Sequence, residues 1–232
     1  MRLFRYDKRD AAAFKKALID YLSRTGRYIP VSLQTGRQPE IKTGRHGKPY
    51  FAEPDLEDVF FSRSHTGDFE IVCFSDSEVG LDCEDVNARK NRNTDFEKIA
   101  ERCFLSDERA YMDAGNPGSE ERFFEIWTGK EAYMKYTGRG FSEGFLSFSV
   151  FDLPDAEIYT GRIESAPFVI YSVCSARSDG AHGFDSALTE IIEICPDGPV
   201  QEVFADEVDS AQLYVTDSDP ERLSQAGCGA GN

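Results

Sequence analysis

Apolar residues recur at helical spacing near the start of the chain and again in its middle. Phe14, Leu18 and Leu22 lie four positions apart within residues 9–24, and Gly26 stands where such a helix would end. The same periodicity predicts helices over residues 94–104, 106–114 and 119–136, with a Gly-Asn-Pro-Gly break at 115–118 between the last two.

Short apolar runs bounded by turn residues predict strands between and after these helices. The loops Gly67-Asp68 and Ser75-Asp76-Ser77 suit hairpins, and residues 44–51 suit a turn. Strands are expected over residues 31–33, 40–42, 59–62, 69–74, 78–85, 146–151, 157–163, 168–173 and 187–194.

The order of these elements, helix then strands and again helices then strands, predicts an α+β fold. We expect two similar α+β halves in a pseudo-twofold arrangement, with a site in the cleft between them. The predicted boundaries are 1–100 for the N-terminal half, 101–204 for the C-terminal half, and 205–232 for an acidic, poorly ordered tail.

Composition narrows the function classes. The 232 residues contain no apolar run long enough for a membrane span and no apolar N-terminal leader, so we expect a cytoplasmic protein without a membrane partner. The six cysteines form no Cys-x-x-Cys pair, which favours reduced, buried thiols over disulfides or a zinc site.

Charge is unevenly spread along this acidic chain, whose net charge is −16. Residues 1–50 hold twelve Lys and Arg against four Asp and Glu, whereas residues 185–232 hold eleven acidic residues against Arg222 alone. A basic head on an acidic protein indicates a small anionic ligand rather than a nucleic acid, which the bulk charge would repel. An ordinary solvated basic face is the alternative.

Two acidic segments carry the candidate chemistry. Asp82 and Glu84 would share one face of a strand, and Trp127, Glu131 and Lys135 one face of a helix. Three carboxylates and a lysine suit a hard divalent cation beside a phosphate. The alternatives are a solvated strand face and a surface ion pair of about 0.2–0.5 kcal/mol.

Four motifs, taken in order, resemble those of the 4′-phosphopantetheinyl transferases, in particular the monomeric, surfactin-synthetase-activating type. The resemblance covers about residues 1–175. The motifs are Gly47-Lys48-Pro49, Phe61-Ser62-Arg63-Ser64-His65-Thr66-Gly67, Gly80-Leu81-Asp82-Cys83-Glu84 and Trp127-Thr128-Gly129-Lys130-Glu131-Ala132-Tyr133-Met134-Lys135.

The resemblance implies a two-half α+β enzyme that moves the 4′-phosphopantetheine arm of coenzyme A onto a serine of an apo acyl or peptidyl carrier protein. Adenosine 3′,5′-bisphosphate would be released, and the reaction would need Mg²⁺. Such carriers serve fatty acid, polyketide or nonribosomal peptide biosynthesis. The partners implied are coenzyme A and the carrier protein, and a monomer is expected.

The resemblance also assigns roles to residues. Asp82, Glu84 and Glu131 would hold Mg²⁺ on the coenzyme A pyrophosphate, which Lys135 would also face. Glu131, or a water near it, would be the general base, with a metal-bound water as an alternative. Asp82, Glu131 and Lys135 are thus the catalytic candidates.

The coenzyme A contacts implied are those of the nucleotide end. Ser64 and His65 would contact phosphate, His65 being a candidate for the 3′-phosphate, while Lys48 and Pro49 would line the adenosine end. On this view the carrier would meet an apolar surface, whose expected residues are Phe104, Tyr111, Met112 and Phe123-Phe124.

Two features depart from the family pattern. Members of this type generally have a strand and a basic helix ahead of the segment that matches Lys8–Ala11, and Ala12-Ala13 replaces a His-Arg pair. Arg9, Lys15 or Lys16 could substitute for that arginine. One rival is therefore a catalytically weakened homologue that binds carrier protein or coenzyme A without efficient transfer; another is a non-enzymatic acidic interaction protein.

Overall fold

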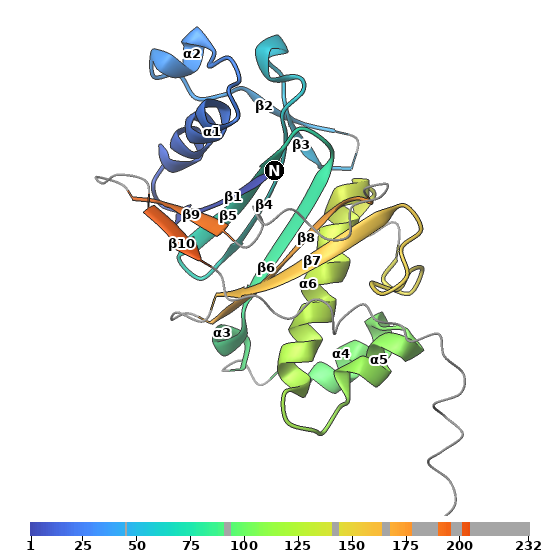
Figure 1. Ribbon diagram of the computed structural model, residues 1–232. Helices are drawn as coiled ribbons and strands as arrows, with labels where there is room; N and C mark the ends of the chain where they lie inside the picture. Colours follow the sequence, from blue (N-terminus) through green and yellow to red (C-terminus); the bar gives the residue numbers. More distant parts are fainter. Residues whose placement is uncertain are drawn as a thin grey trace, which may run out of the picture.

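The computed structural model describes most of the chain (Figure 1). The residues described are 1–44, 46–90, 94–140, 144–163, 168–177, 190–195 and 201–204. The helices are α1 (Ala13–Arg24), α2 (Val31–Gln34), α3 (Val86–Lys90), α4 (Phe96–Cys103), α5 (Ser106–Met112) and α6 (Ser119–Thr137), with a 3-10 turn at Pro54–Leu56. The strands are β1 (Arg2–Asp7), β2 (Ile41–Thr43), β3 (Pro49–Phe51), β4 (Phe60–Thr66), β5 (Phe69–Ser75), β6 (Val79–Asp85), β7 (Ala156–Ile163), β8 (Val169–Ala176), β9 (Glu190–Ile194) and β10 (Gln201–Phe204).

The strands form two larger sheets and a hairpin. One sheet has the order β10-β9-β1-β5-β4, the other has the order β6-β8-β7, and β2 pairs with β3. All of these pairings are antiparallel except that of β1 with β9, which is parallel. The α+β class predicted from the sequence is therefore confirmed.

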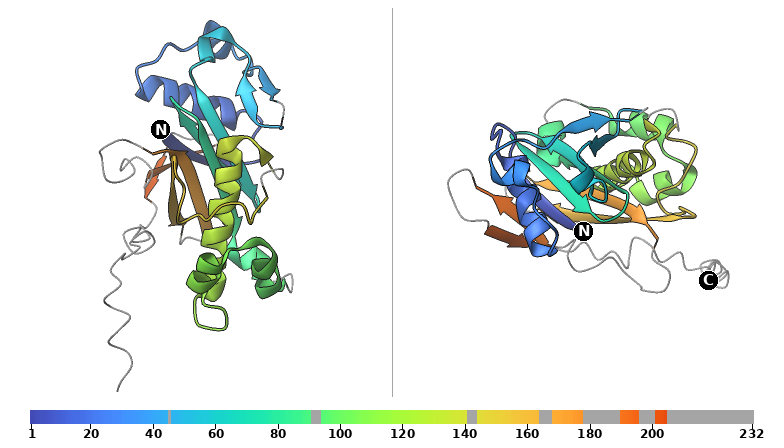
Figure 2. Two further views of the ribbon diagram at one scale, coloured as in Figure 1. Left: turned by 90° about the vertical axis from the view of Figure 1, so that its right-hand side faces the viewer. Right: turned by 90° about the horizontal axis from the view of Figure 1, so that it is seen from above.

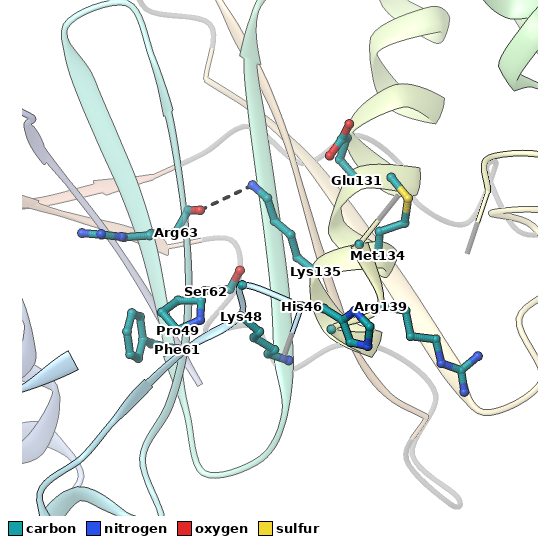
Figure 3. Close-up of a pocket in the computed structure, with 13 residues that line it drawn as sticks. His46, Lys48, Pro49, Phe61, Ser62, Arg63, Glu131, Met134, Lys135 and Arg139 are labelled. Atoms are coloured by element: carbon teal, nitrogen blue, oxygen red, sulfur yellow. Dashed lines mark hydrogen bonds between the residues drawn. The ribbon is translucent and has the colours of Figure 1, made fainter. Parts of the chain in front are cut away.

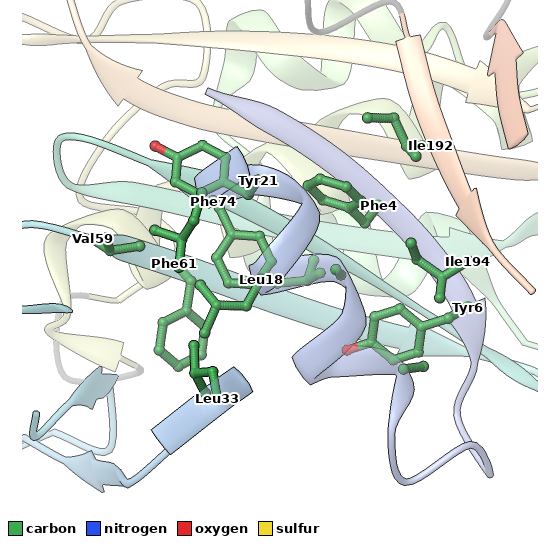
Figure 4. Packing of buried hydrophobic residues seen from close by; sticks show 14 of the residues in the cluster. Phe4, Tyr6, Leu18, Tyr21, Leu33, Val59, Phe61, Phe74, Ile192 and Ile194 are labelled. Atoms are coloured by element: carbon green, nitrogen blue, oxygen red, sulfur yellow. The ribbon is translucent and has the colours of Figure 1, made fainter. Parts of the chain in front are cut away.

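Alternation along the strands distributes the core over both faces of the five-stranded sheet. Phe4 and Phe74 face α1, where Leu18 and Tyr21 pack against them (Figure 4). Leu3, on the opposite face of β1, joins a second cluster between the two sheets. Because side chains alternate at a period of two, one strand supplies both cores.

The second cluster joins the sheets face to face. Ile71 and Cys73 of β5 pack with Leu81 and Cys83 of β6, and with Val173 of β8. The other face of the three-stranded sheet is covered by α6, which runs beside it in the left view of Figure 2. α6 is thereby held against β6, and this contact sets the position of the site described below.

The helices α4, α5 and α6 share a third core, and five of its apolar residues were expected to form a carrier-binding surface. That expectation is wrong for four of the five residues. Phe104, Met112, Phe123 and Phe124 are each buried, at 3% exposure or less. Tyr111 is half-buried, and its hydroxyl donates to Glu125 at 2.7 Å. The apolar spacing reflects the helix-helix core, not a docking face.

Two predicted strands are wrong. Residues 31–33 form the short helix α2, which follows Pro30. Residues 146–151 form turns with one isolated bridge, because buried side chains take backbone groups that a strand would need. The Lys130 ammonium donates to the carbonyls of Phe145 and Phe148, at 2.7 and 2.8 Å, and the Val150 amide donates to Glu108 at 2.9 Å.

The division at residue 100 and the pseudo-twofold relation stay predictions. In the structure, strands from both sides of residue 100 pair within each larger sheet: β6 with β8, and β1 with β9. The predicted tail at 205–232 lies outside the described residues. Among the described helices, none is long and apolar enough to cross a membrane.

Candidate active site

Gly80 lets the backbone of α6 approach β6 at the centre of the candidate site. A Cβ at this position would lie 1.9 Å from the Ala132 carbonyl oxygen and 2.4 Å from the Tyr136 amide nitrogen. No side chain fits there. Asp82 and Glu84 follow Gly80 at the period of two, so they share the face of β6 that α6 covers. The two acidic segments, one on a strand and one on a helix, are thus brought together as predicted.

A row of hydroxyl groups on β4 joins that strand to β6. Ser62 Oγ accepts from the Leu81 amide and Thr66 Oγ1 from the Asp85 amide, each at 2.9 Å. Between them, Ser64 Oγ donates to Asp82 Oδ1 at 2.8 Å. The alternation of the Ser-Arg-Ser-His-Thr motif is explained by this arrangement, since its hydroxyl residues face β6.

Lys135 completes the contacts of Asp82. Its Nζ donates to Asp82 Oδ1 at 2.9 Å and to the Arg63 carbonyl oxygen at 3.4 Å, the latter drawn as a dashed line in Figure 3. Burial lowers the pKa of Lys135, but the charge and hydrogen bond of Asp82 outweigh it and leave the pKa raised. Hydrogen bonds to β4 and β6 therefore fix the position of the Lys135 ammonium.

Glu131 lies one turn before Lys135 on α6. Burial, together with the negative charges of Asp82 and Glu84, raises the pKa of Glu131 to about 7 against the opposing charge of Lys135. The charges of Asp82 and Glu84 therefore act electrostatically on the Glu131 carboxylate. Within the described ranges, however, no group of three or more His, Cys, Asp or Glu side chains stands in an arrangement that could hold a metal ion.

A cavity of about 490 Å³ opens beside Glu131 and Lys135 (Figure 3). One wall comes from the β2–β3 hairpin and β4, and the other from the end of α6 and the residues that follow it. The lining consists of His46, Gly47, Lys48, Pro49, Phe61, Ser62, Arg63, Glu131, Met134, Lys135, Gly138, Arg139 and Gly140. Among these described residues Glu131 is the only carboxylate, against several basic side chains, so the cavity favours an anionic ligand.

The sequence-predicted residues divide between the cavity and its surroundings. Lys48, Pro49, Glu131 and Lys135 line the cavity. Ser64 does not: it is buried beneath the site, bound to Asp82.

His65 is exposed and lies on the face of β4 opposite Ser64, by the alternation of the strand. Asp82 is nearly buried and holds Lys135 from behind the lining. The cavity lining and the strand of carboxylates are therefore adjacent but distinct parts of the site.

Sequence reasoning assigns no role to His46, Met134 or Arg139, which also line the cavity. A signal exists for Arg139, since Gly138 and Gly140 flank it directly after a helix that carries a lysine. Both glycines adopt left-handed backbone, with φ of 66° and 56°, which turns the chain back over the cavity. Arg63 lines the cavity too, but its guanidinium points away from Lys135 in Figure 3 and lies 3.7 Å from Glu70.

The neighbouring motif residues are structural. Lys130 is fully buried and pairs with Glu108 at 2.9 Å, both at 0% exposure. Trp127 stacks between Phe123 and Phe145, with ring centroids 5.9 and 5.1 Å away. The helix face that sequence spacing assigns to the site therefore reaches it only through Glu131 and Lys135.

The cations suggested as substitutes for the missing family arginine lie elsewhere. Arg9 binds Asp7 through two hydrogen bonds, and Lys15 donates to the Gly36 carbonyl oxygen at 2.8 Å. Lys16 lies 3.6 Å from Asp10. None of these three described residues lines the cavity.

Comparison with known proteins agrees with this geometry. Residues 78–185 match the 4′-phosphopantetheinyl transferase superfamily. The chain is 32% identical to the 4′-phosphopantetheinyl transferase Sfp of Bacillus subtilis over 151 residues, which cover 60% of this chain and 64% of that protein. It is 41% identical to the 4′-phosphopantetheinyl transferase AcpT of Escherichia coli over 102 residues, 43% of this chain and 49% of that one.

Psf-1 of Bacillus pumilus, another 4′-phosphopantetheinyl transferase, is 35% identical over 112 residues, 47% of this chain and 44% of that protein. The chain thus spans about half to two thirds of the length of the relatives it matches. The region that matches the superfamily, residues 78–185, contains β6 and α6, the two elements that carry Asp82, Glu84, Glu131 and Lys135. The resemblance seen in the motifs is confirmed: over residues 78–185 this chain is similar to the 4′-phosphopantetheinyl transferase superfamily, and proteins named 4′-phosphopantetheinyl transferase are among its relatives.

Proposed function

We propose that this protein transfers the 4′-phosphopantetheine arm of coenzyme A to the acceptor serine of an apo acyl or peptidyl carrier protein. Adenosine 3′,5′-bisphosphate is the second product. The observation that carries the proposal is the cavity with Lys135 and Glu131 on its wall, backed by Asp82 and Glu84 on β6. The names of its relatives support the reaction class.

Coenzyme A is a polyanion, and the cavity lining suits it. Lys135, already held by Asp82 and the Arg63 carbonyl oxygen, would face the pyrophosphate with its remaining proton. Arg139 and His46 stand at the same cavity and would contact phosphate oxygens. Pro49 and Phe61 supply apolar walls suited to an adenine ring or the pantetheine arm.

The carboxylate set fits a hard cation in its chemistry. Glu131 is half-buried near two other carboxylates, and a divalent cation would relieve the repulsion that helps to raise its pKa. Asp82, Glu84 and Glu131 are the residues that would hold Mg²⁺, and Lys135 would have to share Asp82 with it. When bound, Mg²⁺ would neutralise charge on the pyrophosphate.

The chemical step exchanges the phosphoanhydride bond of the coenzyme A pyrophosphate for a phosphoester bond to the carrier serine. The carrier serine oxygen forms a bond to the β-phosphorus of coenzyme A, and the bond from that phosphorus to the bridging oxygen breaks. Lys135 stabilises the negative charge on the departing adenosine bisphosphate. The Glu131 oxygen that does not hold the cation, or a water beside it, accepts the serine proton.

Two of the predicted phosphate contacts enter the proposal with modified roles. Ser64 would act on the site through Asp82, to which it donates. His65 is exposed and would meet the 3′-phosphate from outside the described cavity. A monomer in the cytoplasm, acting in fatty acid, polyketide or nonribosomal peptide biosynthesis, completes the proposal.

The test is the mass of an apo carrier protein after incubation with coenzyme A, Mg²⁺ and either wild-type protein or Glu131→Gln. The proposal expects one phosphopantetheine arm added by wild type and a rate at least about 100-fold lower with the variant. If wild type and Glu131→Gln transferred at the same rate, the assigned role of Glu131 would be wrong.

A catalytically weakened homologue remains the second candidate, and Ala12-Ala13 is the observation that favours it. Ala13 is fully buried against the five-stranded sheet, and no basic side chain in the described part of α1 reaches the cavity. Coenzyme A binding by calorimetry, without mass gain on either an acyl or a peptidyl carrier, would establish this candidate.

A further inference from the structure

Lys48 lines the cavity, yet its ammonium contacts protein groups that lie outside the cavity lining. Its Nζ donates to the Tyr136 carbonyl oxygen at 2.7 Å and forms an ion pair with Glu78. Its side chain is 21% exposed, and Nζ lies 5.9 Å from the centre of the Tyr136 ring. The ammonium is therefore already solvated by protein groups.

These contacts join three segments that are distant in sequence. Lys48 belongs to the β2–β3 hairpin, Glu78 directly precedes β6, and Tyr136 lies in the last turn of α6. A carbonyl in the last turn of a helix has no partner within the helix, so Lys48 satisfies a group that the helix itself leaves open.

The stem of Lys48 also fits against the turn that ends α6. A Cβ on Gly138 would lie 3.2 Å from Lys48 Cδ, so the lysine stem passes over a glycine that has no side chain to obstruct it. Arg139 follows directly, at the edge of the cavity. The hairpin thus reaches the cavity edge through one side chain.

Lys48 stands where two cavities meet. Lys48, Pro49 and Phe61 line both the first cavity and a second one of about 460 Å³, whereas Glu78 lines only the second. The ion pair between Lys48 and Glu78 consequently fixes one wall of the first cavity from behind.

We propose that Lys48 is a positioning residue, a clamp that uses Glu78 and the Tyr136 carbonyl to hold the end of α6 and the hairpin at the spacing coenzyme A requires. The inference rests on the proposed function for its ligand. It differs from the role that the family resemblance implies for Lys48, which is a lining contact at the adenosine end.

The two roles predict opposite effects of Glu78→Gln. If Lys48 contacts an anionic ligand directly, loss of the Glu78 charge frees the ammonium and removes a repulsive carboxylate, so coenzyme A binds more tightly. If Lys48 is a clamp, Glu78→Gln loosens it, and coenzyme A binds more weakly, as it does in Lys48→Met. The sign of the effect therefore decides between them.

The experiment measures coenzyme A binding by calorimetry, transfer kinetics and amide exchange in wild type, Lys48→Met, Glu78→Gln and the double variant. We expect Kd and KM for coenzyme A to rise about tenfold in each single variant, and little further in the double. kcat should change less than about threefold, because Asp82 holds Lys135 separately. Lys48→Arg, which can reach both partners, should restore most of the affinity.

A ligand-free measurement keeps the clamp testable if the proposed function fails. The Gly138 amide donates to the Met134 carbonyl oxygen at 3.1 Å, and its exchange should accelerate in both single variants. The matched control is Lys42→Met with Glu40→Gln, an exposed pair at 3.2 Å at the start of the same hairpin and outside the lining, which should change neither quantity. Tighter binding by Glu78→Gln, or unchanged exchange at Gly138, would overturn the clamp. Absence of coenzyme A binding and transfer by wild type would overturn the proposed function instead.

Discussion

A single methyl group at Gly80 should push apart β6 and α6, the two elements that carry the candidate site. The Cβ of Gly80→Ala would lie 1.9 Å from the Ala132 carbonyl oxygen, 2.4 Å from the Tyr136 amide nitrogen and 2.9 Å from Tyr136 Cβ. Two of these contacts are with backbone, so no rotamer change relieves them. The helix α6 must therefore move away from β6 by roughly an ångström or more, since ordinary contacts to carbon begin near 3.5 Å.

Such overpacking costs about 1–3 kcal/mol when side chains can adjust. Here the backbone of a buried helix must shift, so we expect the upper end, about 3 kcal/mol, in urea unfolding. The shift also lengthens the 2.9 Å contact between Lys135 and Asp82. Misplacement of this size can cost about 100-fold in rate, so transfer per folded molecule should fall by that order.

The control is Gly161→Ala on β7. Its Cβ would lie 2.4 Å from the Tyr171 ring, so it too should destabilise the fold, but the clash is with a side chain and away from the cavity. When the two variants are compared at equal concentrations of folded protein, Gly161→Ala should retain transfer and Gly80→Ala should lose it. Equal activity of the two variants, or wild-type stability of Gly80→Ala, would refute the account of how β6 and α6 are joined.

Individual contacts lead to three further predictions. Lys130→Met leaves the buried Glu108 carboxylate without its ion-pair partner and should lower the free energy of unfolding in urea by about 3–5 kcal/mol. The double variant Lys130→Met with Glu108→Leu should lower this free energy by less. An equal decrease in the single and double variants would contradict the pairing. Ser64→Ala removes a hydrogen bond to Asp82 and should lower kcat about tenfold with KM for coenzyme A nearly unchanged, while a pure rise in KM would instead favour direct ligand contact. In EDTA, Glu131 has a pKa of about 7 in the folded state against its ordinary 4.5, so the native state binds the extra proton and stability should fall as pH rises from about 4.5 to 7. Thermal melts across that range should lose this slope in Glu131→Gln; an unchanged slope would assign the titration to another group.

The elements that carry the site are predictable from the sequence because their patterns are local. Periods of two and of about four are enough to place Asp82 with Glu84, and Glu131 with Lys135. Gly80 has no such signal: the close approach that requires it is a contact with a helix some fifty residues later. The same holds for Ser64, whose partner Asp82 lies on another sheet.

Errors arise where buried polar side chains compete with backbone pairing. Residues 146–151 have a strand-like sequence, yet Lys130 and Glu108 take their backbone groups. Lys130 itself belongs to the motif expected at the site and is instead the centre of the α5–α6 core. A charged residue in a helical pattern does not show whether its partner is solvent, ligand or a buried carboxylate.

The N-terminal strand β1 is missing from the predicted elements, although its sequence alternates. Leu3 faces one core while Phe4 and Tyr6 face the other, so buried apolar residues lie on both sides of the strand. Its partner β9 comes from near the far end of the chain, a pairing that no local pattern indicates.

The central claim is transfer of the phosphopantetheine arm, and intact mass spectrometry of an apo acyl carrier protein tests it most directly. The carrier is incubated with this protein, coenzyme A and Mg²⁺, with and without excess EDTA. The account predicts a gain of one phosphopantetheine arm that EDTA abolishes. No gain on either an acyl or a peptidyl carrier, from protein shown to be folded and to bind coenzyme A, would contradict it.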